Sequence, residues 1–165
     1  SSLYALRGVA GWTMCVAALK GALETDRRYM SVATATVTTA RATLYKPTGA
    51  QTSALGRRNN ADGSASQSFG ALYVSTSHIL TVVGDFTNRT LTVRRNGVQL
   101  GQNTSWLTTG VTPSDGGQFG LGCQPNGTSS LDGTIYQAIL LERAATSDEI
   151  AAMEAFASTK SGIAL

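Results

Sequence analysis

Charged side chains are scarce in this sequence. Only 14% of its 165 residues are Asp, Glu, Lys or Arg, well below the roughly 25% of an average soluble domain. The net charge is +3, and the arginine pairs at 27–28, 57–58 and 94–95 are spread along the chain. A nucleic-acid-binding surface needs basic residues gathered on one face with aromatic residues between them. We therefore expect no nucleic-acid partner, and we assign the arginine pairs to solvated ends of loops and strands.

Cysteine and long apolar runs are also scarce. Cys15 and Cys123 lie in apolar, strand-like segments with no other Cys or His at metal-binding spacing. Free buried thiols are favoured, and a single bridge between neighbouring strands is the alternative. No segment reaches the length of a membrane span, and no signal peptide is visible. The first residues, SSLYALRG, lack Met and indicate a processed or trimmed end.

Sequence signatures of catalysis and metal binding are missing as well. His78 is the only histidine, and no Gly-x-Ser-x-Gly motif accompanies it. We expect it to be a strand-start residue with a satisfied hydrogen bond. A Ca²⁺ site built from loop carbonyls and one aspartate is retained as an alternative, but its ligands cannot be assigned from the sequence. The candidate aspartates are isolated in the sequence: Asp62, Asp85, Asp115 and Asp132. The sequence therefore predicts no cofactor.

What is present is a series of short apolar segments separated by turn residues. With 42% hydrophobic residues, the chain is long enough for a single domain with a real core, spanning residues 1–165. Residues 11–21 predict a central strand that is apolar on both faces, with Trp12, Met14 and Val16 on one side. Further strands are predicted over residues 29–46 (two strands meeting near 39–41), 68–77 (a short strand centred on 72–74), 78–86, 91–95, 98–101, 117–123 and 133–142. Residues 48–67 predict a long surface loop or an irregular hairpin.

The last third of the chain has explicit hairpin and helix signals. Asn96-Gly97 is the favoured pair for a type I′ turn, in which both residues need positive φ. Thr146 is a candidate N-cap, and Glu149 stands at the third helical position, which completes a capping box. The helix face expected to pack on the sandwich consists of Ile150, Met153, Phe156 and Ala157.

In the order of its elements the chain resembles the concanavalin A-like lectin and glucanase superfamily, specifically laminin-G-like jelly-roll domains of phage and bacterial surface proteins. The resemblance is carried by GWTMCVAA, HILTVVGDFTNRTLTVRRNGVQL, FGLGCQPN and LDGTIYQAILLERAATSDEIAAMEAF. It covers residues 11–160, with Ala145 where such domains more usually have Leu. It implies an all-β fold, an antiparallel two-sheet jelly-roll sandwich with one short C-terminal helix.

The glucanases of that superfamily are retaining enzymes with two glutamates and an aspartate on one strand face, which sets two carboxyl groups about 5 Å apart. This chain has no such run. Glu142 ends a predicted strand beside Arg143 without an acidic partner two residues away, and Glu149 and Glu154 belong to the predicted helix. We therefore expect no enzymatic activity.

A sugar site usually needs an aromatic platform and planar polar groups at a loop rim. Trp106, in the polar segment NTSWLTTG, is the candidate platform, and the alternative is that it folds back as a lid on the core. Asn59, Asn60 and Asp62 supply amide and carboxylate groups in another loop. Any recognition is thus expected in the loops of residues 48–67 and 101–117.

The resemblance, the low charge and the absence of a catalytic constellation lead to a non-enzymatic virion surface protein as the first hypothesis. Such a capsid decoration or fibre head would pack on other virion structural proteins, bind host glycans through its loops, and form a homo-oligomer, with a trimer as the expected state. The alternative is a secreted or cell-surface carbohydrate-binding lectin module. A third hypothesis is a glycan hydrolase with an unrecognised site. No membrane contact is expected.

Overall fold

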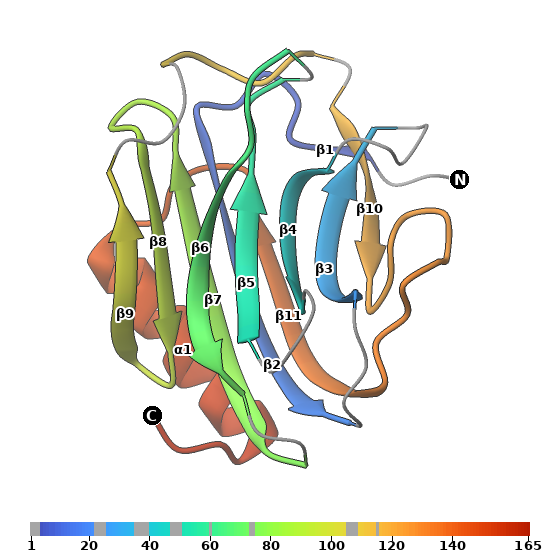
Figure 1. The fold of residues 1–165 in the computed structure, drawn as a ribbon. Coiled ribbons are helices and arrows are strands. Elements are labelled where there is room, and N and C mark those ends of the chain that lie inside the picture. Colours follow the sequence, from blue (N-terminus) through green and yellow to red (C-terminus); the bar gives the residue numbers. More distant parts are fainter. Residues whose placement is uncertain are drawn as a thin grey trace.

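The computed structural model describes residues 4–21, 26–34, 40–46, 51–59, 61–72, 75–104, 109–114 and 116–165. These residues form two antiparallel sheets packed face to face, with a helix against one of them (Figure 1). Sheet A has the strand order β1 (Tyr4–Ala5), β10 (Gly117–Leu121), β3 (Arg27–Ala33), β4 (Ala40–Lys46), β5 (Gln51–Gly56) and β6 (Ala65–Ala71). Sheet B has the order β11 (Gly133–Leu141), β2 (Gly11–Lys20), β7 (Ser77–Asp85), β8 (Thr90–Arg95) and β9 (Val98–Asn103). The predicted all-β sandwich with one C-terminal helix is confirmed.

Strand β2 is buried on both faces, as its sequence predicts. Trp12, Met14 and Val16 point between the sheets and belong to the main core cluster. Cys15 and Ala17 point outward and belong to a second cluster under the helix. Burying an aliphatic side chain stabilises the fold by roughly 1.5–3 kcal/mol, so each face of β2 needs an apolar partner. Sheet A covers one face and the helix covers the other.

The helix α1 (Ser147–Ser161) begins and ends as predicted. Thr146 and Glu149 form the reciprocal capping box, and Gly162 closes the helix with a φ of 72°. Met153 and Ala157 pack against sheet B. Phe156, which was expected on the same face, is 45% exposed, and this prediction is wrong. The apolar stripe on the helix is narrower than predicted because small residues occupy most of its surface.

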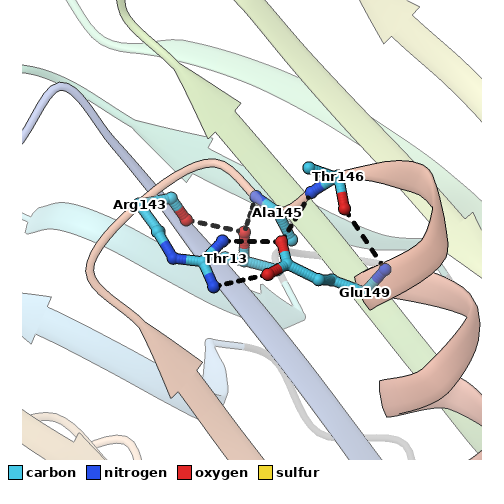
Figure 2. A network of polar contacts seen from close by, with 5 residues as sticks. All are labelled: Thr13, Arg143, Ala145, Thr146 and Glu149. Carbon is cyan, nitrogen blue, oxygen red and sulfur yellow. Dashed lines mark hydrogen bonds and ion pairs between the residues drawn. The ribbon is translucent and has the colours of Figure 1, made fainter.

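The start of α1 is fixed to β2 by a network of polar contacts (Figure 2). The buried Thr13 hydroxyl donates to the Arg143 carbonyl at 2.9 Å and accepts the Ala145 N–H at 2.9 Å. Arg143 donates two hydrogen bonds of 2.6 Å to the Glu149 carboxylate. The same carboxylate accepts the Thr146 N–H at 2.9 Å. A strand of sheet B thus positions the first turn of the helix.

The predicted hairpin at Asn96-Gly97 is confirmed. Both residues have positive φ, 47° and 80°, as a type I′ turn requires. The Asn96 side chain also accepts the Ile79 N–H at 2.8 Å. Leu91 and Val93 are both fully buried, in agreement with the predicted alternation.

Three expectations about segments and side chains need correction or refinement. Residues 48–67 contain β5 and the start of β6, so the hairpin alternative holds and the long loop does not. The strand predicted around residues 72–74 corresponds to β6, which lies earlier in the chain and ends at Ala71. Ala71 pairs with Gln51, the first residue of β5. Residues 73–74 lie outside the described part. Both cysteines are free, but only Cys15 is buried, and burial raises the pKa of its thiol to about 11. Cys123 follows β10 and is half-buried.

We predict that the capping carboxylate makes stability depend on pH. Hydrogen bonds from Arg143, and then from the Thr146 N–H, lower the pKa of Glu149 from 4.5 to about 2. Because the folded pKa lies below the unfolded one, this stabilisation is present above pH 4.5 and is lost as the pH falls toward 2. The free energy of unfolding, measured with urea at several pH values in this window, should fall less steeply with decreasing pH for Glu149→Gln than for the parent chain. The control Asp148→Asn removes a neighbouring first-turn charge and should keep the parent's dependence of the free energy of unfolding on pH. The same pH dependence in Glu149→Gln as in the parent would contradict the role assigned to Glu149.

Candidate functional site

The two loops in which recognition was expected meet at one end of the sandwich. The turn between β5 and β6 lies at the same end as the connection from β9 to β10 (Figure 1). The two segments touch at Gly110, where a Cβ atom would lie only 2.9 Å from Nη1 of Arg58. Gly110 also has a φ of 127°, which other residues rarely adopt. We call this end of the sandwich, residues 57–59, 61–62 and 109–112, the loop end.

The polar groups predicted for ligand contact are partly used inside the turn. Oδ1 of Asn59 accepts the N–H groups of Ala61 and Asp62 at 2.9 and 3.0 Å. The Asp62 carboxylate accepts two hydrogen bonds from Arg58, at 2.9 Å from Nε and 3.2 Å from Nη2. Asn59 and Asp62 therefore lie together and shape the turn. Asn60 and Trp106 lie outside the described residues and stay predictions.

The groups left over at the loop end are hydrogen-bond donors. Nδ2 of Asn59 and Nη1 of Arg58 have no hydrogen-bond partner among the described residues. The Nε of Arg57 is buried and also lacks one within the described part of the chain. The bond to Asp62 raises the pKa of Arg58, so this guanidinium stays charged. We call Arg57, Arg58 and Asn59 the donor cluster.

Backbone pairing places Arg57 beside a second arginine. The Arg57 N–H donates to the Arg41 carbonyl at 2.9 Å, one position beyond the paired residues Ala42 and Gly56. The Arg41 side chain is almost fully buried. Like charges at opposing positions of neighbouring strands disfavour each other. The pairing of β5 with β4 therefore places the backbone of Arg57 next to that of Arg41.

The outer face of sheet A extends from the loop end along β4 and β5, and no helix covers it in Figure 1. At the far end of this face the guanidinium of Arg28 lies 4.6 Å from the centre of the Tyr45 ring. Arg28 also pairs with Asp26 at 2.8 Å. Next to β10 the face is covered by the segment after that strand, where the Ser31 hydroxyl donates to the Cys123 carbonyl at 3.0 Å. Arg41 and Thr43 alternate with the core residues Ala42 and Leu44 on β4, and they are only 1% and 2% exposed. The face is therefore covered near the loop end as well.

The described residues show no catalytic pair of carboxylates. Glu142 accepts the Leu6 N–H, Glu149 caps the helix, and Glu154 binds Arg94. Within the same residues no three His, Cys, Asp or Glu side chains gather as a metal site. No helix in the described part of the chain is long and apolar enough to cross a bilayer.

His78 differs from expectation in its hydrogen bonding. It stands at the start of β7 as predicted, and it is 8% exposed. Neither ring nitrogen has a hydrogen-bond partner among the described residues, so the expected satisfied hydrogen bond is wrong. Burial lowers the pKa of His78, and the nearby charges of Arg95 and Lys20 lower it further. These surroundings favour the neutral form of the His78 imidazole over the charged form.

No protein-family model and no curated protein sequence matches the chain significantly. Solved structures do share its fold. One is the CBM40 carbohydrate-binding module of the Ruminococcus gnavus IT-sialidase bound to α2,3-sialyllactose, with 13% identity, a TM-score of 0.71, and coverage of 89% of this chain and 83% of that one. Another is a heptameric SAP-like pentraxin from Limulus polyphemus, with 14% identity, a TM-score of 0.65, and coverage of 99% and 76%.

The chain is also similar to one part of larger sialidases. The NanB sialidase of Streptococcus pneumoniae matches with 12% identity and a TM-score of 0.67, but this chain spans only 27% of that enzyme. Together these likenesses establish the fold, a two-sheet β-sandwich that this chain shares with the CBM40 and pentraxin structures.

The sequence-based interpretation missed Arg57 as a site residue. It grouped the pair at 57–58 with the other scattered arginines, because nothing local distinguishes them. No alternation of apolar and polar residues marks residues 51–56, which read Gln-Thr-Ser-Ala-Leu-Gly. The position of Arg57 across from Arg41 follows only from the pairing of β5 with β4.

We predict that the two halves of the Asn59 amide have separable roles. Asn59→Ala removes the acceptor of two turn hydrogen bonds and should lower the free energy of unfolding by about 1 kcal/mol. Asn59→Asp keeps an acceptor oxygen at Oδ1 and should leave stability within about 0.5 kcal/mol of the parent. Urea unfolding of both variants measures this difference. Equal losses in the two variants would contradict a role for the side-chain oxygen.

Proposed function

We propose that this chain is a non-catalytic carbohydrate-binding module whose loop end holds an anionic sugar. The observation that carries the proposal is the donor cluster, in which internal bonds use the acceptor oxygens and leave guanidinium and amide N–H groups for a ligand. Guanidinium groups bind carboxylates with paired, charge-assisted hydrogen bonds. A sugar acid offers such a carboxylate next to hydroxyl groups that accept from the Asn59 amide.

The comparisons support the same chemistry. The CBM40 structures similar to this chain are described as bound to α2,3- and α2,6-sialyllactose, whose sialic acid carries a carboxylate. They support a lectin module, the alternative of the sequence analysis, more than its first hypothesis of a virion structural protein. The lectin proposal places the protein outside a cell. A virion location and a trimeric assembly stay predictions.

A binding role also agrees with the described carboxylates. Each described glutamate already holds a structural N–H or guanidinium group. The similarity to sialidases covers a minor part of those enzymes, as expected when a binding module is attached to a catalytic domain. Turnover of a glycan by the purified chain would contradict this proposal.

The first test of the loop end compares a charged and a neutral sugar. Isothermal titration should detect 3′-sialyllactose binding, and Arg57→Gln should weaken it about tenfold or more, since a hydrogen bond to a charged group contributes roughly 1.5–3 kcal/mol. Lactose lacks the carboxylate and should show no such dependence. The matched control Arg89→Gln removes the same charge from the exposed β7–β8 turn and should bind as the parent does. Equal affinities for the two sugars would contradict an anionic ligand.

The second test concerns the predicted aromatic platform. A glycan array with the parent chain and Trp106→Ala should show binding that is lost in the variant, because stacking on an indole face is a main source of sugar affinity. Retained binding would favour the alternative that Trp106 acts as a lid on the core. No binding by either protein, together with a defined oligomer in size-exclusion chromatography, would favour a structural role in a particle.

A further inference from the structure

A hollow lies on sheet B, beside the start of α1. It has a volume of about 370 Å³ and is formed by the outer face of β7–β9 and the residues leading into the helix. Its polar lining consists of Asp85, Thr90, Thr92, Arg94, Gln99 and Ser147. Its apolar floor includes Val83 and Ile150. We call this hollow the helix-side groove. Pockets that hold small ligands have volumes of this order.

The groove offers unused hydrogen-bonding groups of both kinds. The side chains of Thr90, Gln99 and Ser147 have no hydrogen-bond partner among the described residues. The Thr92 hydroxyl accepts a bond of 2.9 Å from the Gln102 amide, so its own hydrogen is available to an acceptor. Asp85 binds two backbone N–H groups through Oδ1, and its Oδ2 accepts only the Asn88 amide.

Arg94 is held rigidly at the groove by the helix. Its Nε and Nη2 donate to the two oxygens of Glu154, at 2.9 and 3.1 Å, and Nη2 also donates to the Gly97 carbonyl. Glu154 is only 2% exposed, so the pair is largely shielded from water. Nη1 has no partner within the described residues. The groove therefore contains an oriented donor whose charge the helix already balances.

The charge balance decides which ligand class fits. Arg94 is neutralised by Glu154, and Asp85 is the other charged group of the lining. Asp148 stands in the first turn of the helix next to the groove. An anion would meet these carboxylates, and the apolar floor does not suit a hydrated cation. A neutral ring with several hydroxyl groups matches both the mixed donors and acceptors and the aliphatic floor.

We propose that the helix-side groove is a second binding site, for a neutral pyranose unit. The Arg94 Nη1 and Thr92 hydroxyl donate to sugar oxygens, Asp85 accepts from a hydroxyl, and Gln99 does both. Val83 and Ile150 contact the C–H face of the ring. The site does not rest on the proposed function, because it lies on sheet B and uses none of the loop-end residues.

The test is a ¹⁵N NMR titration of the full chain with methyl β-galactoside, methyl α-glucoside and, separately, the methyl glycoside of sialic acid. A neutral glycoside should shift the amide signals of residues 90–99 and 144–150. The double variant Gln99→Ala/Ser147→Ala should weaken this binding about fivefold or more, the effect of losing roughly 1 kcal/mol of hydrogen bonding. Both residues have exposed or surface side chains, and the unperturbed remainder of the spectrum reports that the variant is folded. The control Val98→Ala alters an exposed neighbour that does not line the groove and should bind as the parent does.

Three results would overturn this proposal: no shifts with either neutral glycoside, shifts confined to residues 57–62 and 109–112, or groove shifts with the sialoside only. The loop-end proposal is judged separately, by sialoside shifts at residues 57–62 and their loss in Arg57→Gln. A negative result for one of the two proposed sites therefore does not affect the test of the other.

Discussion

The burial of β2 on both faces is the constraint on which the rest of this structure depends. The strand has apolar side chains on both sides. Sheet A covers the inner face of sheet B, and the outer face of sheet B needs a second apolar partner. The helix α1 supplies that cover, and the buried Thr13 hydroxyl fixes where the helix begins. This arrangement leaves the outer face of sheet A without a helix (Figure 1). It also creates the helix-side groove, because α1 packs on β11, β2 and β7 and reaches β8 through the Glu154–Arg94 pair.

Hydrogen bonds made inside the protein decide what each open surface offers to a ligand. In the β5–β6 turn, the oxygens of Asn59 and Asp62 bind backbone and guanidinium N–H groups. The turn is stabilised by its acceptors, and only donors remain. In the helix-side groove, hydroxyl and amide groups stay unpaired, so donors and acceptors are both present.

The two surfaces also differ in how their arginines are neutralised. Arg94 has a buried carboxylate that binds it through two nitrogens, and its charge is balanced within the fold. Arg58 is balanced by Asp62, and the neighbouring Arg57 has a buried Nε without a hydrogen-bond partner among the described residues. In the two proposals, the same residue type therefore takes part in a neutral site in one place and in an anion site in the other. The fold shared with carbohydrate-binding modules is compatible with both, since such sites depend on loops and exposed faces rather than on the core.

Sequence alone determined the features that depend on local physical chemistry. The two-sided apolar pattern of residues 11–20, the positive φ at Asn96-Gly97 and the capping box at Thr146 and Glu149 follow from side chains within a few positions of one another. These signals were sufficient for the sandwich and its terminal helix. They were not sufficient for β5, because a strand that reads Gln-Thr-Ser-Ala-Leu-Gly has no apolar alternation and forms through pairing with its neighbours rather than through its own propensity.

Only the tertiary structure decided how the candidate sites are built. It set Arg57 beside Arg41, brought Gly110 against Arg58, and exposed Phe156 where the helical pattern predicted a contact. It also joined β7, β8, β9 and the helix start into one groove. Each of these depends on which strands become neighbours and on which side chains use up one another's hydrogen bonds. Residues far apart in the chain settle those matters, so spacing along the sequence does not reveal them.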